Sequence, residues 1–112
     1  MRVIDNNTVE VNVSYDISPV LAGSNAIASS SLFYSIGVGA PVLAKATTEV
    51  NPMGGDHVSY VLDIPAPINV ITTFDFYAVE TDIFGNVSPH SLDVKLTVNR
   101  LAPAAPINFT VA

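Results

Sequence analysis

The chain has 112 residues, which corresponds to one domain of ordinary size. Val, Ile and Thr supply 33 of the 112 residues, whereas Gln and Trp are absent, and this inventory favours strands over helices. Hydrophobic residues make up 49% of the chain and charged residues 12%, which excludes a disordered chain. A net charge of −6 argues against nucleic acid as a partner, and the absence of cysteine excludes a disulfide framework or a thiol nucleophile.

The first half of the chain predicts three strands. Residues 8–15 alternate between apolar and polar side chains, which indicates a half-buried strand. Residues 16–31 contain Pro, Gly, Asn and several Ser, so we expect them to form a long connection. Residues 32–38 predict a second strand that ends at the glycines and Pro41, and residues 42–50 predict a weaker strand suited to a sheet edge.

The second half predicts three more strands. Residues 58–64 place four apolar side chains on one face, and the Pro-Ala-Pro segment after them ends the strand. Residues 72–81 form the most aromatic strand, in which Glu80 has the inward parity and is expected at the rim of the core. Residues 92–98 show the clearest alternation, with Leu92 and Val94 among the inward side chains. Six strands joined by turns of Gly, Pro and Asn predict an all-β protein, an antiparallel β-sandwich.

The sequence of residues 74–89 adds a more specific signal. Two aromatic residues, Phe74 and Phe76, precede an Asp-x-x-Gly-Asn turn over residues 82–86 and a Ser-Pro pair. In this feature the chain resembles a fibronectin type III domain, or a related immunoglobulin-like module of the bacterial or phage kind. The resemblance covers about residues 8–99 and implies a sandwich of about seven strands. It implies that residues 11–16 are strand B, 32–38 strand C, 42–50 strand C′ and 58–64 strand E. Residues 74–89 would contain strand F and the turn toward strand G.

The chain departs from the family pattern at two places. Phe74 stands where the family often has the tyrosine of the tyrosine corner, so the hydroxyl-to-backbone hydrogen bond cannot form. The segment before Val9 is also too short for a full strand A. The sequence therefore predicts a fibronectin III/immunoglobulin-like sandwich over residues 1–99, with its N-terminal strand reduced.

The C-terminal segment, residues 100–112, is expected to be a Pro/Ala linker followed by a strand. Its apolar side chains alternate at Ile107, Phe109 and Val111, which suits a strand that pairs with an exposed sheet edge of a neighbouring subunit. A linker leading into a following module explains the same residues. Tyr77 and Phe84 are the other candidate protein-interface residues, because both are aromatic and expected at the surface. Phe84 could equally cap the end of the core.

Residues that could support catalysis or bind a ligand are few. His57 and His90 fall in predicted loops and are expected to be solvated, and no phosphate loop or metal motif occurs. Asp82 and Asn86 could offer two oxygen ligands to calcium, but ordinary turn chemistry explains both residues. We therefore expect no enzyme activity, no metal and no cofactor. Direct carbohydrate binding is not expected either, because Trp is absent and most aromatic side chains are assigned inward.

The terminal residues and the mean hydropathy of the chain indicate where the protein is expected to act. No run of about 18 apolar residues occurs, so we expect no membrane insertion. The first residues lack the apolar core of a signal peptide. A mean hydropathy of +0.45 with few charges fits a surface that is partly covered by other protein subunits. A surface rich in Ser, Thr and Asn explains the same values equally well.

These features together predict a structural module that assembles into or decorates a larger particle. The particle is a phage virion (its decoration, collar or tail) or an extracellular fibre, and the partners are other protein subunits. The location expected for the chain is therefore a virion or the cell surface. The alternative is a spacer or adhesion module from a tandem-domain bacterial surface protein or a secreted glycoside hydrolase.

Overall fold

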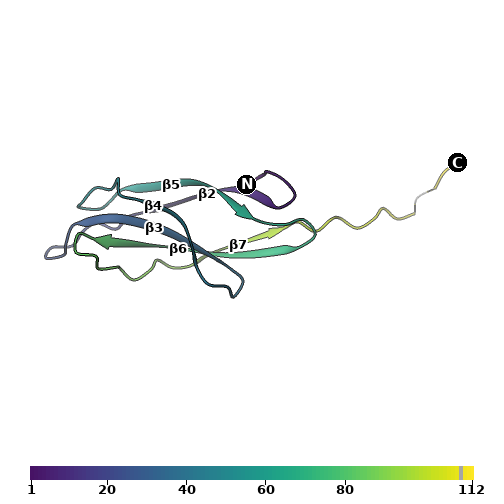
Figure 1. Ribbon diagram of the computed structural model, residues 1–112. Helices are drawn as coiled ribbons and strands as arrows, with labels where there is room; N and C mark the ends of the chain where they lie inside the picture. Colours follow the sequence, from purple (N-terminus) through teal and green to yellow (C-terminus); the bar gives the residue numbers. More distant parts are fainter. Residues whose placement is uncertain (109) are drawn as a thin grey trace.

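The computed structural model describes residues 1–108 and 110–112. Their regular structure consists of strands alone, arranged in two antiparallel sheets with the orders β1-β2-β5 and β4-β3-β6-β7 (Figure 1). The strands are β1 (Arg2–Val3), β2 (Thr8–Asp16), β3 (Ile27–Ile36), β4 (Val42–Thr47), β5 (His57–Pro65), β6 (Ile71–Asp82) and β7 (Val94–Asn99). None of the described residues belongs to a helix long and apolar enough to cross a membrane. The predicted all-β class, with seven strands in a sandwich-like arrangement, is confirmed.

The alternating sequence of β2 determines how the three-stranded sheet packs. Val9 is fully buried and Val11 nearly so, and they lie opposite Ile64 and Leu62 of β5. The intervening polar residues point to the outer face, because successive side chains of a strand alternate between faces. The strand therefore has one apolar face, which must pack against the second sheet.

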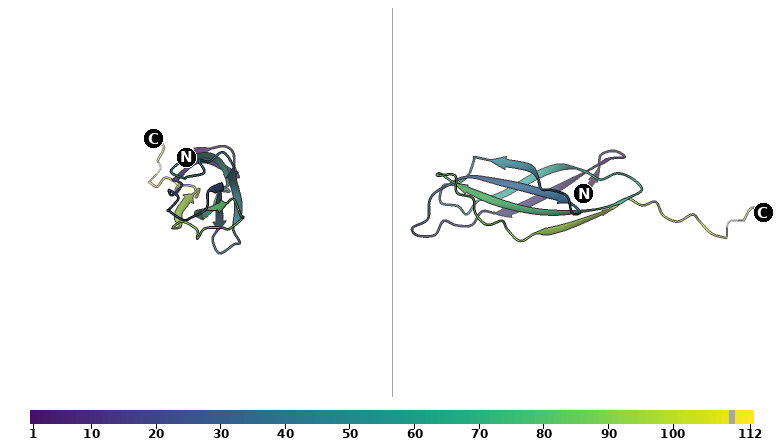
Figure 2. Two further views of the ribbon diagram at one scale, coloured as in Figure 1. Left: turned by 90° about the vertical axis from the view of Figure 1, so that its left-hand side faces the viewer. Right: turned by 60° about the horizontal axis from the view of Figure 1, so that its bottom comes forward.

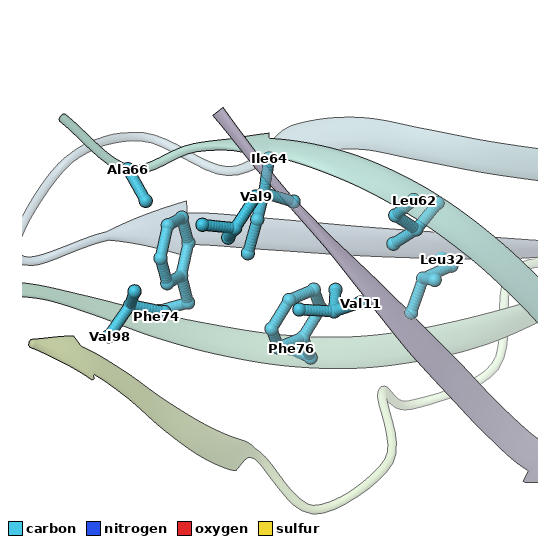
Figure 3. Packing of buried hydrophobic residues seen from close by; sticks show 9 residues of the cluster. All are labelled: Val9, Val11, Leu32, Leu62, Ile64, Ala66, Phe74, Phe76 and Val98. Atoms are coloured by element: carbon cyan, nitrogen blue, oxygen red, sulfur yellow. The ribbon is translucent and has the colours of Figure 1, made fainter. Parts of the chain in front are cut away.

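The core lies between the two sheets (Figure 3). Phe74 and Phe76 project from β6 toward the side chains of the three-stranded sheet, and Val98 of β7 packs beside Phe74. The buried cluster comprises Val9, Val11, Leu32, Leu62, Ile64, Ala66, Phe74, Phe76 and Val98. Each large side chain in it contributes about 1.5–3 kcal/mol through removal from water.

The third strand begins earlier than the sequence suggests. Residues 27–31, expected in a connection, belong to β3, where Ser30 lies opposite Glu80 and Ser31 opposite Val79 of β6. Ser30 is fully buried on the inner face, a place that apolar periodicity does not reveal. The fourth strand ends at Thr47 rather than at residue 50 and lies at the edge of its sheet, as predicted.

The last strand begins later than the alternation suggests. It starts at Val94, and Leu92, expected inward, is 91% exposed. The segment before it follows β6 irregularly, since the Ser91 N–H donates to the Ala78 carbonyl and the Ser88 N–H donates to the Glu80 carbonyl. Proline cannot donate to a ladder, so Pro89 between these contacts prevents regular pairing. The side of the sandwich next to this segment is consequently less well covered.

The chain beyond Asn99 runs away from the sandwich along its long axis (Figures 1 and 2). The principal extents are 78 × 24 × 20 Å and the radius of gyration is 19.2 Å. A compact chain of this length would have a radius of about 13 Å. The described residues 100–108 and 110–112 form no strand within the single chain. Pairing with a neighbouring subunit stays a prediction.

Candidate protein interface

Tyr77 lies on the outer face of the four-stranded sheet, because it alternates with the inward Phe76 and Ala78. Its ring stacks on Phe33 of β3, with 5.3 Å between the ring centroids and 14° between the planes. The centroid of the His90 ring lies 4.7 Å from that of Tyr77. Each ring shields the next from water, so the predicted contact residue Tyr77 is half-buried within the single chain.

Phe84 lies at the tip of the turn after β6 and is 74% exposed. Asp82 holds this turn: its Oδ1 accepts the backbone N–H groups of Phe84 and Asn86, each at 2.9 Å. Its Oδ2 accepts the side-chain amides of Asn86 at 2.9 Å and Asn25 at 3.0 Å. These hydrogen bonds, above all those from the Asn86 and Asn25 amides, lower the pKa of Asp82 to about 2. Both carboxylate oxygens of Asp82 thus accept hydrogen bonds from within the turn and from Asn25.

The C-terminal candidates are exposed. Ile107 is 83% and Val111 84% accessible to water, while Phe109 lies outside the described residues. The turn with Phe84 lies at one end of the molecule and the C-terminal segment leaves from the other (Figure 1). The structure therefore distributes the predicted interface residues over three separate surfaces.

A groove between the two sheets is a feature that the sequence did not predict. It has a volume of about 500 Å³ and runs between β2 on one sheet and the start of β7 on the other. Its exposed apolar lining includes Met1, Leu92 and Val94, which are 75%, 91% and 65% accessible. The alternation of residues 92–98 predicted that Leu92 and Val94 lie on a covered face, and for this reason it did not indicate a groove. The sequence signal that could have revealed it is Pro89, which cannot pair in a ladder just before this strand.

A polar cluster crosses the core at the far end of β2. Ser30 donates its hydroxyl hydrogen to Oε2 of Glu80 at 2.8 Å, which leaves the Tyr15 hydroxyl as the donor to Ser30 Oγ at 2.6 Å. Burial raises the pKa of Tyr15 to about 12. The hydroxyl of Tyr60 is buried beside this chain of hydrogen bonds, without a partner among the described residues. Glu80 has the inward parity predicted and is half-buried.

The two histidines lie at the surface. His57 begins β5, and its Nδ1 lies 2.6 Å from Oδ1 of Asp16, with both side chains mostly exposed. His90 Nδ1 lies 2.9 Å from the carbonyl oxygen of Ser91 and 3.8 Å from Oδ1 of Asp93. In the part of the chain that the structure describes, no three His, Asp or Glu side chains gather in a way that could hold a metal ion.

Comparisons with known proteins identified no relative of the chain. No family model matches the chain, and neither the search of curated proteins nor that of solved structures finds a match.

Proposed function

We propose that the chain is a fibronectin III/immunoglobulin-like module with a structural role. The order of the strands supports the family proposal. The segments that the resemblance names B and E are neighbours in one sheet (β2 and β5), and those named C and F are neighbours in the other (β3 and β6). The last strand, β7, adjoins β6 in the place of strand G.

The proposed role is assembly with neighbouring protein subunits in a larger particle, a phage virion or an extracellular fibre. The observation behind it is the C-terminal segment, which leaves the sandwich and exposes Ile107 and Val111 almost fully. Residues 101–112 contain no charged side chain, although the whole chain has 14 charged residues. An uncharged, apolar, alternating segment loses exposed apolar surface when it adds to a sheet edge of another protein.

Light scattering on residues 1–112 and 1–102 tests this role. We expect the full chain to associate at high concentration and the shortened chain to remain monomeric near its calculated mass. The shortened chain retains all seven strands, so its circular dichroism spectrum should be unchanged. Monomers in both samples at high concentration would contradict self-association through the C-terminal segment.

A spacer in a tandem array is the second candidate. The observation that favours it is the direction of residues 100–108, which continue β7 along the long axis and contain Pro103 and Pro106 (Figure 1). Proline-rich linkers are extended and semi-rigid, as a spacer requires. Further sandwich modules encoded directly beside these residues would select this function over assembly by strand exchange.

A further inference from the structure

Strand β2 has one edge that is open over most of its length. On one side it pairs with β5 from Thr8 to Asp16, and on the other side β1 covers only Val9 and Glu10. The Thr8 carbonyl accepts the Ile4 N–H on the β1 side. Because backbone groups alternate between the two edges of a strand, Asn12 and Ser14 direct their N–H and C=O groups to the same open side. No described residue pairs with them there.

The groove of about 500 Å³ follows this open edge. Val11, Val13 and Tyr15 of β2 line one wall, and the opposite wall includes Leu92, Val94 and Leu96. Lys95 is the single charged residue of the lining. The site thus offers unpaired backbone hydrogen-bonding groups beside an apolar trough, which is what an added strand requires.

The C-terminal segment has the matching properties. Residues 107–111 in strand conformation would span about 13 Å, and the open part of β2 from Val11 to Asp16 spans about 17 Å. Ile107 and Val111 have the same parity, so both would enter the trough together, and the backbone groups of Asn108 and Thr110 would bind the edge. Asn108 has a φ of 55° in the single chain, so this segment must straighten when it binds.

A second groove, at the start of β5, is a poorer acceptor for this segment. The surface at the start of β5 is lined by Glu49, Asp56 and His57, which an uncharged apolar strand would desolvate without compensation. The edge of β2, in contrast, already accepts a strand, because β1 pairs antiparallel with its first residues. An added strand would continue the row where β1 ends.

We propose that residues 107–111 of one molecule add to the open edge of β2 in a second copy of this chain, with Ile107 and Val111 in the groove between β2 and β7. This inference rests on the proposed function and names its acceptor. One chain presents both the donor segment and the acceptor edge, and the segment leaves its own sandwich pointing away from it (Figure 2). Residues 101–106 allow up to about 20 Å between the two bodies. Since the two surfaces differ, repeated addition gives a ring or a filament.

Paired single-cysteine variants of the full chain test the acceptor, because the chain has no cysteine of its own. We expect Ser14→Cys mixed with Thr110→Cys to form a disulfide-linked heterodimer in at least tenfold higher yield than either variant alone. Thr110 has the parity opposite to Ile107, so its side chain would lie on the outer face of the sheet beside Ser14. Ser59→Cys is the control, since Ser59 pairs with Ser14 from β5 and lies too far from the open edge for a disulfide.

A charge placed in the segment tests the orientation of its side chains. Ile107→Asp should reduce the yield of the crosslink at least about tenfold, because it would bury a carboxylate in the apolar groove. Asn108→Asp adds the same charge at the neighbouring position of outward parity and should leave the yield within about twofold. Equal losses in both variants would contradict the proposed orientation.

Four outcomes would overturn the inference. A crosslink through Ser59 rather than Ser14 would place the segment on β5. An intramolecular disulfide in the double variant Ser14→Cys/Thr110→Cys at low concentration, without heterodimer in the mixture, would mean that the segment folds back on its own chain. If residues 1–112 associate, residues 1–102 do not, and Ser14 forms no crosslink, assembly stands and this acceptor fails. If neither length associates, both proposals fail.

Discussion

Replacement of Ser30 by alanine removes one buried oxygen that serves two other groups. Ser30 Oγ accepts the Tyr15 hydroxyl and donates to Glu80, at a position with no exposure to water. A hydrogen bond between neutral groups contributes about 0.5–1.5 kcal/mol and one to a charged group about 1.5–3 kcal/mol. Tyr15 and Glu80 are only half-buried, so water replaces part of both interactions. We expect Ser30→Ala to lower the free energy of unfolding by about 2 kcal/mol, or the Tm by about 8 °C.

Urea denaturation followed by circular dichroism measures this loss, and a double-mutant cycle assigns it. Tyr15→Phe removes the hydroxyl that donates to Ser30, so the two substitutions should be non-additive by about 1 kcal/mol. Ser35→Ala is the matched control, because Ser35 lies on the opposite face of the same strand, and it should change stability by less than about 0.5 kcal/mol. Additive effects of the two substitutions would refute the hydrogen-bonded chain from Tyr15 through Ser30.

Three further predictions follow from single groups. Burial raises the pKa of Tyr15 to about 12, so as the pH rises the unfolded state loses this proton before the folded state does. The stability that Tyr15 provides below pH 10 should therefore decrease between pH 10 and 12, and urea titrations of Tyr15→Phe should show a smaller decrease. The Asn86 and Asn25 amides lower the pKa of Asp82 to about 2 from 3.8, so its contribution, present above pH 3.8, should be lost as the pH falls toward 2; a carboxyl midpoint above 3 by NMR would contradict this. Gly54→Ala should destabilise the protein more than Gly55→Ala. Both glycines have positive φ, but only at Gly54 would a Cβ collide with the Ser18 carbonyl. Equal losses of stability in thermal unfolding would count against the collision.

Strands with one apolar face were predictable, because a period of two in the sequence is the direct consequence of burial on one side. That reasoning located β2, β5 and the aromatic β6 to within a few residues. The same reasoning failed at Ser30, because a pattern based on hydropathy predicts a loop at a serine even where its side chain lies on the inner face. Its two hydrogen-bonding partners, Tyr15 and Glu80, explain why a hydroxyl lies there, and they are 15 and 50 residues away in the sequence.

The candidate interface was less accessible to sequence reasoning. Exposure of Phe84 could be predicted from its place in an Asp-x-x-Gly-Asn turn, and the structure agrees. Half-burial of Tyr77 could not, since it depends on Phe33 from another strand and His90 from a loop. The groove required knowledge of where two irregular segments lie in space, because neither the N-terminal residues nor residues 87–93 indicate by themselves which edge they leave open.

Two departures from an ideal sandwich open the same side of the molecule. The first strand is limited to Arg2 and Val3, and Pro89 delays the start of the last strand, so β2 and β7 face each other without full cover. Leu92 and Val94 remain exposed there, whereas the C-terminal segment exposes Ile107 and Val111 at the other end. A monomer keeps both apolar sets in water, and an assembly in which one set covers the other removes them together. In the assembly that we propose, the incomplete edge and the unpaired segment are two halves of one interaction. An N-terminal extension that continues β1 along β2 should therefore weaken the association of residues 1–112 as effectively as removal of residues 103–112.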